Sequence, residues 1–165
     1  MALVPRILST WRAPGATVAS LRGMPEPSML ALLIGTMAVY FVAQWPGLAR
    51  AAQIDPSVPL NARLAGALLA TLFLMPLLVL AVAGIVQLVA RVLGLRLGGA
   101  DSRLALIWAL AATAPAMLLA GLVGGLIGPG PGLTLVHVVS GLAFVLFWGT
   151  GLAALARRPD RRRLS

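Results

Sequence analysis

Residues 64–90 read LAGALLATLFLMPLLVLAVAGIVQLVA, a stretch without a single charged side chain. A helix needs about 20 apolar residues to cross the hydrocarbon core of a bilayer, where it must satisfy its own backbone hydrogen bonds. Three further stretches meet this requirement, at residues 28–45, 104–127 and 133–156. The sequence therefore predicts an all-α, polytopic integral membrane protein with four transmembrane helices.

Two breaks limit these spans. Pro46 and Gly47 are expected to end the first span, because proline removes a backbone donor and glycine favours turns. The segment GPGPG, residues 128–132, cannot continue a helix and permits a tight reversal. The third and fourth spans are therefore predicted to be antiparallel neighbours.

The composition excludes a water-soluble domain. Of the 165 residues, 60% are hydrophobic and 10% are charged, whereas a soluble domain carries about a quarter charged residues. The net charge of +9 would suit nucleic acid, but all 13 cations are arginines outside the apolar runs, and they form no basic face. We expect no nucleic-acid partner. The absence of cysteine excludes disulfides and thiolate metal sites.

The arginines are distributed unevenly between the two sides of the predicted spans. Only Arg50 and Arg63, both in the first loop, fall on the side that also carries GPGPG. The other side carries Arg6, Arg12, Arg22, Arg91, Arg96, Arg103, Arg157, Arg158, Arg161, Arg162 and Arg163. Because cytoplasmic loops carry the excess of Lys and Arg, both termini are predicted to be cytoplasmic. Tryptophan rings favour membrane interfaces, so Trp45 is expected on the outer side, and Trp108 and Trp148 toward the cytoplasm, with plain packing as the alternative. The lysine-free, Ala/Gly/Pro/Arg-rich usage is typical of a GC-rich bacterial genome, hence of a bacterial inner membrane.

Two segments flank the transmembrane domain of residues 28–156. Residues 1–27 form a cytoplasmic amphipathic segment, in which Ile7, Leu8 and Trp11 share a helical face that can lie in the head-group layer. Residues 157–165 form a basic cytoplasmic tail, whose five arginines we interpret as a topology determinant drawn to anionic lipid head groups. The alternative is a protein-docking tail.

No group of residues suited to catalysis is visible. The spans hold no Asp, Glu, Lys or Arg at depth, and no two carboxylates are spaced for acid–base work or metal binding. We therefore expect a non-enzymatic protein without catalytic, cofactor-binding or metal-binding residues. His137, the only histidine, is interpreted as a hydrogen-bonding partner of a neighbouring helix or of interfacial water, with ligation of haem or bacteriochlorophyll as the alternative. Gln44 is expected to form a similar hydrogen bond.

Prolines and glycines mark helix kinks and helix contacts. Pro76 and Pro115 fall near the bilayer midplane, where each frees a backbone carbonyl and creates either a plain kink or the wall of a cavity. In GLVGGLIG, residues 121–128, small residues four positions apart let helices approach closely. The predicted packing interface joins the third span to the fourth, with homo-oligomerisation as the alternative. Its residues are Gly121, Gly124, Gly125, Gly128 and Gly141.

Four segments resemble small bacterial members of the Yip (Ypt-interacting protein) membrane family. They are RILSTWRAPGAT (6–17), FVAQWPGLAR (41–50), ALIWALAATAPAMLL (105–119) and LIGPGPGLTLV (126–136). The resemblance implies a compact multispan fold and membrane residence, and the eukaryotic members are associated with Rab-type GTPases and vesicle traffic. We expect a scaffold or partner of other membrane proteins, surrounded by membrane lipids. The alternatives are a small transporter that uses the two mid-span prolines, and an accessory subunit of a respiratory or photosynthetic complex.

Overall fold

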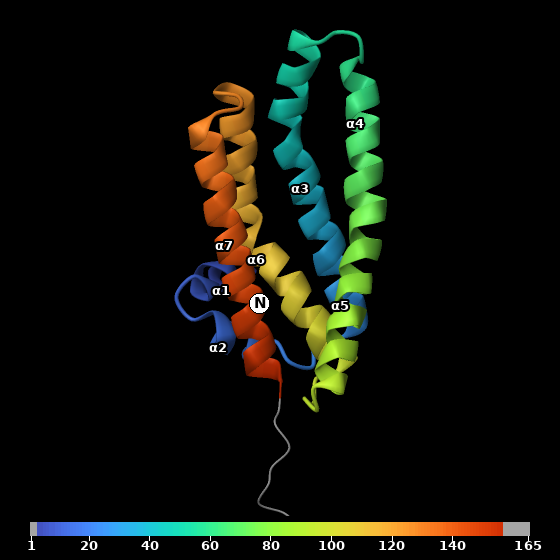
Figure 1. Ribbon diagram of the computed structural model, residues 1–165, viewed down its shortest axis with the longest axis vertical. Helices are drawn as coiled ribbons and strands as arrows, with labels where there is room; N and C mark the ends of the chain where they lie inside the picture. The colour runs from blue at the N-terminus through green and yellow to red at the C-terminus, as the bar shows by residue number, and fades with distance from the viewer. Residues whose placement is uncertain (1–2, 157–165) are drawn as a thin grey trace, which may run out of the picture.

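The computed structural model describes residues 3–156, and the regular elements in that range are all helices. Four helical rods are long and apolar enough to span a membrane. The chain is therefore an all-α, multi-pass membrane protein (Figure 1). Its elements are α1 (Leu3–Thr10), α2 (Pro14–Ser20), α3 (Glu26–Ile54), α4 (Leu60–Leu69), the π-helical turn η1 (Ala70–Leu74), α5 (Met75–Val92), α6 (Gly99–Leu126) and α7 (Pro131–Leu155).

Helix α6 is the centre of the bundle. It packs against α3, α7 and α5, and most side chains of residues 102–114 are buried. The outer helices bury a smaller share of their residues and carry exposed leucines such as Leu77 and Leu142. Exposed apolar side chains of this kind suit a lipid environment.

The two ends of the bundle differ. One end, here named the hairpin end, holds α1, α2, the α5–α6 connection and the end of α7 (Figure 1). The other, here named the turn end, holds the α3–α4 loop and the α6–α7 turn. Both described termini lie toward the hairpin end, as an even number of spans requires. The tail arginines Arg157, Arg158, Arg161, Arg162 and Arg163 lie outside the described residues.

The first span is longer than expected, because α3 continues through Pro46 to Ile54. The prediction that Pro46 ends it is wrong. In lipid, a proline that stays in the helix loses one backbone hydrogen bond, whereas breaking the helix would leave several polar groups unsatisfied. The helix ends where Asp55 adopts an extended backbone immediately before Pro56, a conformation that a following proline favours.

The second span is one continuous helix from Leu60 to Val92, interrupted in its register by the π turn η1. Pro76 follows this turn directly and has no N–H to donate to the carbonyl of Leu72. The wider π turn is a common way to accommodate such a gap, and π turns recur at functional sites. The break predicted at Pro76 therefore takes the form of a π bulge.

The amino-terminal segment forms a helical hairpin that packs along the side of the bundle against α6 and α7 (Figure 1). Pro14 opens its second helix, as proline often does at a first helical position. Val18 and Leu21 are buried in the core, and Val18 lies against Gly151 of α7. The hairpin is thus part of the folded domain and not only an interfacial anchor.

The hairpin changes the environment of Trp108. The sequence favours an interfacial position for this ring, but its side chain is completely buried. Its Nε1 donates a hydrogen bond of 3.0 Å to Oγ1 of Thr10 in α1. The structure favours the alternative interpretation, packing inside the protein, because α1 covers this face of α6 and supplies the acceptor that a buried indole needs.

Candidate functional site

The glycine ridge of α6, a name used here for Gly121, Gly124 and Gly125, lies at a helix crossing. Its main partner differs from the one expected. A Cβ on Gly121 would lie 1.8 Å from the carbonyl oxygen of Ala43, and one on Gly125 would lie 2.2 Å from Cβ of Pro46. Both neighbours belong to α3, so the prediction that these two glycines face the fourth span is wrong. Residues four apart share one helical face, and this face turns toward α3.

The other predicted packing glycines have separate surroundings. Gly124, on an adjacent face of α6, does approach α7, where a Cβ would lie 3.7 Å from the methyl groups of Leu133. Gly128 is buried with a left-handed φ of +91°, and a Cβ there would lie 2.8 Å from Nε of Arg50. Gly141 is exposed, and a Cβ there would meet no described atom within 4 Å. The predicted set therefore does not form one interface.

Pro115 removes one backbone hydrogen bond from α6. Side chains from two other segments pack over this turn. The proline has no N–H for the carbonyl of Ala111, and its ring pushes against that carbonyl. On one side, the hydroxyl of Tyr40 donates to the carbonyl of Leu110 at 3.0 Å. On the other, Nε1 of Trp11 donates to the carbonyl of Ala112 at 3.2 Å. This turn of α6 is therefore held by side chains from α3 and from the turn that follows α1.

The Trp11 ring also packs on α7. It meets the ring of Phe147 edge to face, with centroids 5.1 Å apart. Ala112 lies nine residues beyond Arg103, which is about 13 Å along the helix at 1.5 Å per residue. The indole of Trp11 therefore contacts α6 about 13 Å along the helix from Arg103.

Two ion pairs tie elements together at the hairpin end. Arg22, after α2, binds Asp101 of α6 through two contacts, Nε to Oδ1 at 3.2 Å and Nη2 to Oδ2 at 3.0 Å. The same guanidinium donates to the carbonyl of Leu155, the last residue of α7. Arg103 pairs with Glu26 at the start of α3. The contacts of Arg22 fix the hairpin to α6 and α7, and the Arg103–Glu26 pair joins α6 to α3.

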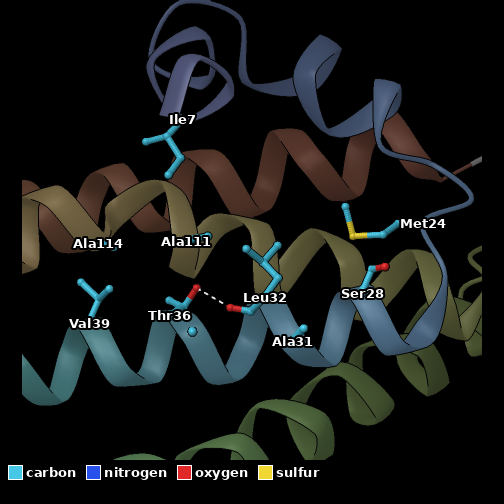
Figure 2. Close-up of a pocket in the computed structure, with 10 residues that line it drawn as sticks. Ile7, Met24, Ser28, Ala31, Leu32, Thr36, Val39, Ala111 and Ala114 are labelled. Carbon is cyan, nitrogen blue, oxygen red and sulfur yellow. Dashed lines mark hydrogen bonds between the residues drawn. The ribbon is translucent and has the colours of Figure 1, made fainter. Parts of the chain in front are cut away.

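A groove of about 570 Å³, here named the α1–α3 groove, runs between the hairpin, α3 and α6 (Figure 2). In Figure 2, Ile7 points into it from α1, and Ala111 and Ala114 come from α6. Its lining residues are Ile7, Met24, Ser28, Ala31, Leu32, Gly35, Thr36, Val39, Ala111 and Ala114. The groove is apolar, and most of its floor consists of small side chains.

The hydroxyl of Thr36 does not contribute a free donor to the α1–α3 groove, because it donates to the carbonyl of Leu32 at 2.8 Å. Gly35 is exposed, and a Cβ there would meet no described atom within 4 Å. The groove therefore offers shape and apolar contact, without a site for directional chemistry.

A second groove of about 470 Å³, here named the α3–α7 groove, lies nearer the turn end. Polar groups enter it from three elements: Tyr40 and Gln44 from α3, Thr71 from η1, and His137 from α7. Nε2 of Gln44 donates to Oγ1 of Thr71 at 2.9 Å, which confirms that Gln44 is an interhelical hydrogen bonder.

His137 is exposed in this groove and forms no hydrogen bond with any other residue of the described range 3–156. The expected bond to a neighbouring helix is therefore absent from that range. In the same part of the chain, no group of three or more His, Cys, Asp and Glu side chains is arranged to hold a metal ion.

Tyr40 and Thr71 are site residues that sequence reasoning did not single out. For Tyr40 a signal existed, since Thr36, Tyr40 and Gln44 recur every four residues and mark a polar stripe on one helical face. For Thr71 there was none, because its role depends on the π turn and on a partner in another helix.

Comparisons with known proteins give no match: no family model, curated protein or solved structure is similar to this chain.

Proposed function

We propose that the protein is a non-enzymatic scaffold of Yip type in a bacterial inner membrane. In this proposal the α1–α3 groove receives a transmembrane helix of another membrane protein. The observation that carries it is the small-residue floor of that groove, formed by Ala31 and Gly35 of α3 and Ala111 and Ala114 of α6. Helix contacts in lipid depend on close packing of backbones, which small residues permit.

The groove is the better candidate surface because the glycine ridge is already used inside the chain. Gly121 and Gly125 contact α3 and have no room for a partner. Gly35, by contrast, has open space around its Cα. Ile7 and Val39 stand at the groove's sides and would pack around an inserted ridge of side chains.

The distribution of arginines supports an orientation with the hairpin end in the cytoplasm. Arg22, Arg91, Arg96 and Arg103 are at that end, while Arg50 and Arg63 flank the α3–α4 loop. The groove then opens in the cytoplasmic half of the bilayer, next to a surface that attracts anionic head groups. A scaffold whose partner is a large respiratory or photosynthetic complex would be an accessory subunit of that complex.

The test is a crosslinked pull-down from native membranes with two matched variants. Gly35→Leu fills the α1–α3 groove, whereas Gly84→Leu adds the same side chain to an open position of α5 outside the described grooves. Neither Cβ meets a described atom, so both variants should fold. We expect Gly35→Leu alone to lose the partner that the unmodified protein captures. Equal capture by both variants would refute the proposal.

A second candidate function is passage of a small solute, favoured by the polar side chains of the α3–α7 groove. The groove adjoins the π turn before Pro76 and lies beyond the Pro115 kink. Solute flux through liposomes containing the purified chain, lost on Gly47→Leu, would support this candidate over the scaffold.

A further inference from the structure

We propose that the α3–α7 groove binds a membrane quinone, a flat, lipid-soluble ring with two carbonyl acceptors. This inference does not depend on the proposed scaffold function, which concerns the α1–α3 groove. It rests on two hydrogen-bond donors that face an apolar slot from opposite walls and have no acceptor in the described chain.

The first donor is Thr71. Six threonines of the described chain donate their hydroxyl proton to the carbonyl four residues earlier: Thr10, Thr17, Thr36, Thr113, Thr134 and Thr150. Thr71 does not, because it lies in the π turn, where the preceding carbonyls are displaced from their α-helical positions. Its oxygen accepts from Gln44, and its own proton has no acceptor within residues 3–156. The side chain is only 5% exposed, so this donor is buried against the groove.

The second donor is His137, on the opposite wall. Helix α6 packs against both α3 and α7 and forms the floor between them, with Gly121 and Gly124 among the floor residues. Thr71 comes from η1, which packs on α3, and His137 comes from α7, so the two donors line the groove from opposite sides of this floor. A neutral imidazole always carries one N–H, and an ionisable residue inside a span usually marks a functional site.

The ligand must match both donors and the apolar lining. It needs two acceptors on opposite edges, a flat body that fits the apolar groove, and solubility in the bilayer from which the groove is reached. Benzoquinones and naphthoquinones have all three properties. An acyl chain would leave both donors without an acceptor, which is unfavourable above all for the buried hydroxyl of Thr71. The volume of about 470 Å³ also lies in the usual range for small-molecule sites.

The test uses the full chain in nanodiscs of quinone-free phosphatidylcholine, labelled with an azido-ubiquinone and competed with decyl-ubiquinone. We expect competed adducts on peptides of α3, η1 or α7 that line the groove. Thr71→Val and His137→Leu should each weaken competition about tenfold, the effect of losing one hydrogen bond of about 1.4 kcal/mol.

Three further variants keep the test decisive. Gly47→Leu should abolish competed labelling, because its side chain enters the groove where a Cβ meets no described atom. Gly84→Leu and Thr134→Val, which change open or already satisfied positions, should leave it intact. Thermal unfolding of each variant shows that it remains folded. Labelling that is spread over lipid-facing helices, or unchanged in Thr71→Val and His137→Leu, would overturn the proposal, as would a haem absorption band in the purified protein.

Discussion

Replacing a glycine by alanine should have opposite effects on the two kinds of glycine in this bundle. At Gly121 the new Cβ would lie 1.8 Å from the carbonyl oxygen of Ala43, whereas real Cβ atoms essentially never approach within 3.0 Å. The obstacle is backbone, which cannot rotate away, so α3 and α6 must separate. Gly125→Ala meets the same obstacle at Pro46.

The size of the effect follows from the geometry of that crossing. Separation by about 1 Å forfeits a quarter to a half of the dispersion energy of the atoms in contact. In lipid no hydrophobic gain replaces it, so we expect destabilisation by about 1–3 kcal/mol, as for overpacking in other cores. At Gly141, where nothing lies within 4 Å, alanine should instead gain up to about 1 kcal/mol from helix propensity.

The assay is reversible unfolding in mixed micelles with increasing SDS, followed by tryptophan fluorescence. The buried ring of Trp108 should report loss of the core. Gly124→Ala is the matched control on α6, because its Cβ would be in ordinary contact with Leu133 at 3.7 Å. If Gly121→Ala proved as stable as Gly141→Ala, the α3–α6 crossing described above would be incorrect.

Two further predictions concern the hairpin. Trp11→Phe keeps an aromatic contact with Phe147 but removes the donor to the Ala112 carbonyl. It should lower the free energy of unfolding by about 1 kcal/mol in the same assay. An unchanged midpoint would show that this hydrogen bond does not stabilise the turn at Pro115. Arg22→Gln should cost about 1 kcal/mol and expose the hairpin to protease, since it breaks the pair with Asp101. In a double-mutant cycle, Asp101→Asn should then add little, and strict additivity would contradict the coupling.

The number and type of spans could be predicted because they depend on long apolar runs, and such runs are stable as helices in the hydrocarbon core of a bilayer. The packing partner of the glycine ridge could not. Helix α6 is apolar all round and buried on several faces, so no periodic polar face shows which side meets α3 and which meets α7. Both Gly121 and Gly124 have the spacing for close contact, and the structure directs them to different neighbours.

The differences between expectation and structure at Pro46 and Trp108 have a common origin. Both predictions treat a residue by its behaviour at a boundary, as a helix breaker or as an interfacial anchor. Tertiary context decides otherwise, because lipid favours a continuous helix at Pro46 and because α1 covers Trp108. The role of Thr71 in the α3–α7 groove could not be predicted either, since this threonine becomes exceptional only through the π turn.

The central claim is that the α1–α3 groove receives a transmembrane helix, and photocrosslinking from inside the groove tests it most directly. A benzophenone side chain placed at position 35 has room in the groove, and one placed at position 84 faces open space on α5. After irradiation of native membranes, the claim predicts an adduct from position 35 to a transmembrane peptide of another protein, and none to that peptide from position 84. Only lipid adducts from position 35, or the same protein adduct from both positions, would contradict it.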